Sequence, residues 1–231
     1  MKLLLVASDA MEFHGLLPLS TQVRPAAIPI HWSRIAQLGS HEILLAANGA
    51  GPHRAAAAVD AAAPSFHPDA IVSLGFAGAL DPQLAIAEIV VGTAILAGGA
   101  TFAAQSPAAA TPHRQGAVCS ITHIASTATE KRQLHTTGAI AVEMEAAGVA
   151  ERAQNLRLPF FCIKTVTDLA AETMANDFNA ALRSDGKFDT IRILQSSLLH
   201  PWVRLPELVR LRSRCILAAR SLGEFIANCR F

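Results

Sequence analysis

The sequence predicts a single α/β domain, residues 1–231, with a twisted, mostly parallel central sheet flanked by helices and a helical C-terminal extension at 200–231. Two observations lead to this fold class. Short apolar runs alternate with helical segments, which is typical of α/β sheets. Most of the runs are apolar at successive positions, as expected for strands buried on both faces. With 231 residues and 52% hydrophobic content, the chain is long enough for one sizeable core.

Seven segments are predicted to be strands, because they are short, apolar and rich in β-branched residues. They are residues 3–7, 42–47, 70–74, 88–91, 117–121, 139–142 and 160–166. Helices are predicted between them at 52–63, 129–135 and 144–156. Residues 98–112 are mostly small, which favours a loop.

The C-terminal part is predicted to be helical at 176–182, 187–199 and 205–227. In the last segment apolar residues recur at helical spacing, and arginines outnumber glutamates. Two interpretations stay open. The segment can be a terminal helix that packs on the sheet and exposes a basic face to solvent. It can also be a surface for peripheral membrane or lipid-substrate contact, because basic amphipathic helices favour membrane surfaces.

Charge and cysteine content exclude several classes of protein. A formal net charge of +1 gives no reason to expect a nucleic-acid partner. The four cysteines lack the spacing of a zinc site or a disulfide framework, so a cytoplasmic location is expected. The apolar run at 3–7 is too short for a signal peptide. Nothing in the sequence requires a metal or a redox cofactor.

Carboxylates stand at the ends of two predicted strands. Glu143 and Glu145 lie in Val-Glu-Met-Glu-Ala at 142–146, just before a predicted helix, and Asp168 follows the run 159–167. Strand ends are where α/β folds bind small molecules. Two acids that converge there can divide the roles of proton donor and charge stabiliser.

Five ordered segments resemble the nucleoside phosphorylase and methylthioadenosine–adenosylhomocysteine nucleosidase superfamily. They are residues 1–12, 48–63, 74–79 with 88–91, 142–146, and 167–168. The resemblance implies an α/β fold and cleavage of the N-glycosidic bond of a purine nucleoside. It also implies a homodimer or larger homo-oligomer.

The purine is a poor leaving anion, so a positioned acid that protonates it lowers the barrier. Asp168 is the candidate for protonating purine N7, although an Asp there can also be a helix cap or turn residue. Glu145 is the candidate for binding the ribose hydroxyls, although a Glu in a first helical turn is also favoured by the helix dipole. By resemblance Met144 lies against the sugar, and Thr167 belongs to the same site. Glu143 either braces the loop or accepts a hydrogen bond from a hydroxyl group.

The group that activates the nucleophile is left open between two residues. Related hydrolases carry a Glu two residues beyond the Met-Glu start, and that position is His14 here. Either His14 or Glu12 takes the role of base, since an imidazole is able to do so near neutral pH. His14 can equally be a packing residue of the turn.

Hydrolysis is favoured over phosphorolysis, for which inorganic phosphate would be the second substrate. Related phosphorylases place an Arg and a Ser at the positions of Ser73 and Phe76, and polyanion binding needs such groups. Phe76, Ala77 and Gly78 are the expected binding loop. Lys164 stands where relatives often carry Arg, although it can also be a solvated lysine at a strand end.

A large Phe76 and the long tail suggest a substrate with an apolar 5′ group. Residues 182–210 resemble the hopanoid-associated members of the superfamily, which implies adenosylhopane as substrate and release of adenine. Thioether nucleosides and futalosine are alternatives. A nucleoside-binding protein without turnover is the competing class, and the retention of Glu145 and Asp168 counts against it.

Overall fold

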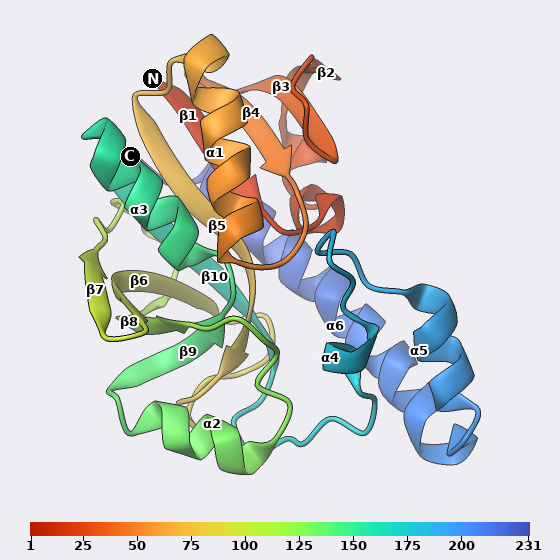
Figure 1. Cartoon of the computed structure of the whole chain (residues 1–231). Helices are drawn as coiled ribbons and strands as arrows, with labels where there is room; N and C mark the ends of the chain where they lie inside the picture. Colours follow the sequence, from red (N-terminus) through yellow and green to blue (C-terminus); the bar gives the residue numbers. More distant parts are fainter.

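A mixed sheet of ten strands forms the centre of the computed structural model, which describes residues 1–231 (Figure 1). The strands are β1 (Lys2–Ala7), β2 (Thr21–Pro25), β3 (Trp32–Leu38), β4 (His41–Ala47), β5 (Ala70–Ala79), β6 (Ile89–Ala97), β7 (Ala100–Ala103), β8 (Arg114–Ser120), β9 (Ala139–Glu143) and β10 (Phe160–Asp168). The helices are α1 (Pro52–Phe66), α2 (Ala128–His135), α3 (Ala146–Leu156), α4 (Phe178–Ala181), α5 (Thr190–Ser197) and α6 (Pro201–Ala227). Two 3₁₀ turns, η1 (Ala10–Phe13) and η2 (Leu17–Leu19), follow β1.

The sheet is partly open and partly closed. Strands β10, β6, β8, β9 and β5 pair in that order, and β5 pairs again with β10, so these five form a ring. From β5 the sheet continues through β1, β4 and β3 to β2. The predicted α/β fold is confirmed. The sheet is mixed rather than mostly parallel, because the β10–β6, β5–β9, β6–β7, β3–β4 and β2–β3 pairs are antiparallel.

Helices cover both faces of the sheet. On one face, Leu4 and Val6 of β1 pack in a core that includes residues of α1 and α3. On the other face, Leu3 and Leu5 share a core with residues of α6. Alternate residues of one strand thus enter two cores. This explains why the β1 run is apolar at every position.

The second half of α6 is part of the core. Leu222, Phe225 and Ile226 are almost fully buried against the sheet. The helix also approaches the turn after η1 so closely that a Cβ on Gly223 would lie 2.2 Å from the carbonyl carbon of Gly15. The extension at 200–231 therefore packs on the sheet in its last turns. None of the helices combines the length and hydropathy needed to cross a bilayer.

All seven predicted strands are present, and three further strands were missed. β2 is exposed along its whole length and β3 carries polar residues, so neither shows an apolar run. β7 lies within the predicted loop 98–112. The helices at 176–182 and 187–199 are shorter than predicted, and β5 and β6 are longer.

Candidate active site

A cleft of about 390 Å³ lies where several strands of the sheet end. Its floor comes from the residues after β1 and from the last residues of β5, β9 and β10. Its outer wall comes from the α4–α6 segment. As predicted, Glu145 and Asp168 face this one cleft, together with Glu12, Phe76, Ala77, Gly78, Glu143, Met144 and Thr167.

Glu12 enters the cleft because η1 begins directly after β1. The turn has a capping box, in which Asp9 accepts from Met11 N at 2.9 Å and the Glu12 carboxylate accepts from Asp9 N, also at 2.9 Å. The carboxylate also accepts from Ser8 N at 2.8 Å and from Phe76 N at 2.7 Å. Burial raises the pKa of Glu12, and the backbone donors oppose this effect only in part. Glu12 is therefore a fixed carboxyl group with a raised proton affinity.

Two glycines of β5 make room for the acids. A Cβ on Gly75 would lie 2.3 Å from Glu12 Oε1, and Gly75 has a φ of +145° that other residues rarely adopt. A Cβ on Gly78 would lie 2.8 Å from Asp168 Oδ2. The two glycines of this strand are thus explained by the carboxylates that pack against them.

Glu143 fixes the backbone of the turn that carries Glu145. Its Oε2 accepts from Glu145 N at 2.9 Å and from Ala146 N at 2.8 Å, at the N-terminus of α3. The same oxygen lies 2.8 Å from Lys164 Nζ. Both side chains are fully buried. Glu143 therefore braces the turn, which is one of the two roles considered for it.

The Glu145 side chain has one hydrogen-bond partner in the protein. Its Oε1 accepts from Gly51 N at 3.0 Å. Burial, and next the neighbouring charge of Glu143, raises the pKa of Glu145 to about 8. Glu145 therefore binds a proton more readily than an ordinary glutamate, and hydroxyl donors of a ligand would favour its ionised form.

Lys164 is not a solvated lysine at a strand end. It is completely buried in β10 and does not line the cleft. Burial lowers its pKa, but the carboxylate of Glu143 outweighs this and holds the pKa above its ordinary value. Lys164 is therefore a permanent cation beneath Glu143, Glu145 and Glu12, and its attraction opposes the rise in the pKa of Glu12 and of Glu145.

Asp168 is held by two side chains. Thr167 Oγ1 donates to its Oδ1 at 3.0 Å, and Lys131 Nζ donates to its Oδ2. Lys131 comes from α2, is completely buried and also donates to the carbonyl oxygen of Leu169 at 2.9 Å. Asp168 is thus fixed in direction at the end of β10, with a buried ammonium group behind it.

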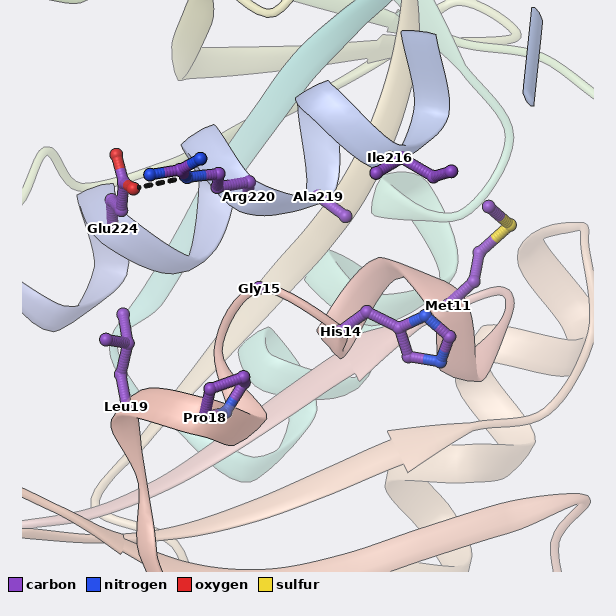
Figure 2. Close-up of a pocket in the computed structure, with 9 residues that line it drawn as sticks. All are labelled: Met11, His14, Gly15, Pro18, Leu19, Ile216, Ala219, Arg220 and Glu224. Carbon is purple, nitrogen blue, oxygen red and sulfur yellow. Dashed lines mark hydrogen bonds and ion pairs between the residues drawn. The ribbon is translucent and has the colours of Figure 1, made fainter. Parts of the chain in front are cut away.

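The structure separates the two candidates for the base. Glu12 lines the cleft, whereas His14 lies outside it in a different pocket, between η1–η2 and α6 (Figure 2). His14 is exposed there, and Met11 of η1 lines both pockets. The 3₁₀ turn points Glu12 inward and His14 outward, so His14 is not placed to act on a ligand in the cleft.

The cleft is rich in carboxylates and has no free cation. Asp9, Glu12, Glu143, Glu145 and Asp168 line it, and His123 is its only basic lining residue. Nε2 of His123 lies 2.5 Å from Oε1 of Glu130, so this ring is already paired with a carboxylate. Arg54, the basic residue near the glycine turn, donates to the carbonyl oxygen of Ser184 at 2.8 Å and does not line the cleft.

The sequence analysis did not identify three residues that hold the carboxylates: Lys131, Ser8 and Gly51, whose backbone N–H donates to Glu145. Lys131 stands among polar residues of a short helix, so no local pattern distinguishes it from a solvated lysine. Ser8 could have been found as the residue between the first strand and the capping Asp9.

The sequence is similar to that of known proteins. The sequence profile of the Phosphorylase superfamily matches residues 4–122 and 100–188. A 5′-methylthioadenosine/S-adenosylhomocysteine nucleosidase of Staphylococcus saprophyticus is 27% identical over 175 residues, which are 63% of this chain and 77% of the relative.

Solved structures share the fold along nearly the whole chain. The S-adenosylhomocysteine nucleosidase of Streptococcus pyogenes, in complex with 5-methylthiotubericidin, superposes with a TM-score of 0.75 at 17% identity, covering 99% of this chain and 95% of that chain. A mutant futalosine hydrolase of Helicobacter pylori gives a TM-score of 0.71 at 13% identity, covering 98% and 96%.

Proposed function

Because this chain belongs to the phosphorylase superfamily, we propose that it is a purine nucleosidase, an N-ribosyl hydrolase that releases adenine from an adenosyl compound with an apolar 5′ group. The bond that breaks joins the purine to C1′ of the ribose. Water supplies the hydroxyl group that ends on C1′, and the proton balance is completed on the departing purine.

The observation that carries hydrolysis is the charge of the cleft. Five carboxyl groups line it, and both buried lysines near it, Lys131 and Lys164, are already paired with carboxylates. A phosphate dianion needs arginines, hydroxyls or amides that are free to donate, and like charges repel it. Water meets no such barrier, so the site favours water as the nucleophile.

Each acid has a distinct part in this reaction. Asp168 takes up a proton from solvent before each turnover and delivers it to purine N7, and Lys131 stabilises the carboxylate that remains after the transfer. Glu145 accepts hydrogen bonds from the ribose hydroxyls and stabilises the cationic sugar of the transition state. Glu12 takes a proton from the attacking water, for which its fixed position and raised pKa are suited.

The outer wall of the cleft supports an apolar 5′ group. It is formed mainly by apolar side chains of the α4–α6 segment: Phe178, Phe188, Ile193, Leu211 and Cys215. Phe76 adds a further ring from β5. An adenosyl compound with a long hydrocarbon substituent, such as adenosylhopane, would bury that group here, whereas a small polar 5′ group would leave the wall uncovered.

A series of 5′-alkylthioadenosines tests this preference. Each buried methylene contributes about 0.8 kcal/mol, so we expect kcat/KM for adenine release to rise up to about fourfold per added methylene until the wall is covered. In the Leu211→Ser variant, kcat/KM should rise much less with each added methylene. Leu208→Ser, one turn earlier on α6 and outside the cleft, is the matched control. If kcat/KM of the unchanged protein does not depend on alkyl length, the apolar preference is rejected, whereas the proposed nucleosidase activity is not.

Two further properties belong to the same proposal. The four free cysteines suit a reducing compartment, and we propose a cytoplasmic enzyme. We also propose a homodimer or larger closed oligomer, because closed symmetric assemblies are the usual oligomers of soluble enzymes. A purine-binding protein without turnover would bind the same nucleosides and release no base.

A further inference from the structure

The exposed apolar side chains of this protein are concentrated in one segment. Of the 15 large apolar residues that are exposed, 11 lie within residues 188–217. We define the apolar tip as the eight of them on α5, on the turn that follows and on the first part of α6: Ile191, Leu194, Leu198, Leu199, Trp202, Val203, Leu205 and Val209. Trp202 is the most exposed, at 91%. We propose that the apolar tip docks this enzyme onto an anionic lipid bilayer.

Buried hydrogen bonds hold the base of the apolar tip in place. Buried Glu207 of α6 accepts from Ala175 N and from Asn176 N, each at 2.8 Å. Asn176 also accepts from Ser197 Oγ of α5 at 2.7 Å. Two turns further along α6, Arg214 makes two hydrogen bonds to Glu172. The tip is therefore an ordered projection from one side of the sheet (Figure 1), and its exposed apolar residues are not explained by loose packing.

The net charge of residues 190–217 favours an anionic lipid surface as the binding partner of the apolar tip. Residues 190–217 contain five arginines and one acidic residue, the buried Glu207, which gives a formal charge of +4, and one of these arginines, Arg214, is paired with Glu172. The whole chain is +1, so the remainder is −3. Basic residues beside exposed Leu, Ile and Trp are the composition of surfaces that lie in the headgroup region of anionic membranes. Tryptophan in particular is favoured at that depth.

A second copy of the chain fits this surface less well. A two-fold symmetric contact would place the apolar tip against itself, and with it two segments that each carry +4. Like charges brought together in this way oppose association. Anionic lipid offers the apolar phase and the opposite charge together.

The same segment reaches the cleft. Phe188 is 41% exposed and also lines the cleft, where it packs edge-on against Phe178. Ile193 and Leu211 line the cleft from α5 and α6. An apolar group could therefore pass from the bilayer to the wall of the cleft along one continuous segment. The passage of an apolar group into the cleft rests on the proposed function, whereas membrane docking does not.

Vesicle sedimentation of the full chain tests the docking. We expect the protein to sediment with vesicles of phosphatidylcholine and phosphatidylglycerol, and more weakly with phosphatidylcholine alone. The variant Leu198→Ser/Leu199→Ser/Trp202→Ser should lose about tenfold or more in binding, because it removes three exposed apolar side chains. Leu19→Ser/Val23→Ser/Leu156→Ser changes three exposed apolar residues elsewhere and should bind as before. Arg192→Gln/Arg212→Gln should lose only the preference for anionic vesicles.

Two readouts keep the outcomes distinct. Adenine release from soluble 5′-methylthioadenosine should be unchanged in every variant, which shows that the fold and the cleft are intact. If no variant releases adenine but the vesicle pattern holds, the proposed function fails and the docking stands. The docking is overturned if the unchanged protein stays in solution with both vesicles, if the apolar-tip variant still binds, or if light scattering shows that this variant only splits a dimer.

Discussion

Replacing Asp168 with Asn is expected to lower kcat for adenine release by about 100-fold or more, the scale of a lost general acid. Asparagine keeps the shape of the side chain and a hydrogen bond from Lys131, but it has no proton to give to N7. KM should change little, because the purine contact remains. Stopped assays of released adenine at saturating nucleoside measure this effect.

Two companion variants define the cause. Asp81→Asn changes an acid in a turn outside the cleft and should leave kcat unchanged. Lys131→Met keeps the length of the side chain but removes the charge that stabilises the Asp168 carboxylate, so kcat should fall while KM is preserved. Normal turnover in the Asp168→Asn protein would show that another group protonates the purine.

Glu12→Gln is expected to be as damaging, with a loss of about 100-fold or more in kcat. The amide still accepts one hydrogen bond in the turn, but it cannot take a proton from water. Because burial raises the pKa of Glu12, the ionised base is lost as the pH falls, so kcat of the unchanged enzyme should decline toward acid pH. Steady-state assays across pH measure both effects.

His14→Gln is the matched control, two residues away on the outward side of the same turn. It should leave kcat and its pH dependence unchanged, since His14 does not line the cleft. The opposite result, with a strong loss for His14→Gln and a weak one for Glu12→Gln, would assign the base to His14. Melting curves for both variants exclude a general loss of the fold.

The parts of the site that follow local patterns could be predicted from the sequence. Glu145 and Asp168 each follow an apolar strand, and strand ends converge in an α/β sheet. The two-faced burial of β1 likewise follows from its unbroken apolar run. Such features depend on neighbouring residues in the chain, which a sequence shows directly.

Other parts depend on contacts that only the folded chain makes. Whether Glu12 or His14 enters the cleft is decided by the direction of a 3₁₀ turn, and the residue types alone left both possible. Lys131 meets Asp168 from a separate helix, with no local sign of burial. Lys164 does carry such a sign, because a lysine within the buried run of β10 must find a carboxylate, and Glu143 is that partner. The edge strands β2 and β3 were missed because exposed strands need no apolar run.

The origin of the oxygen on the sugar product tests the central proposal most directly. The enzyme is incubated with 5′-methylthioadenosine in phosphate-free buffer made with water labelled with heavy oxygen, and the products are analysed by mass spectrometry. Hydrolysis at the Glu12–Glu145–Asp168 cleft predicts free adenine and a ribose product with one heavy oxygen at C1. Adenine release that requires added phosphate and yields an unlabelled sugar 1-phosphate, or binding with no release of base, would contradict it.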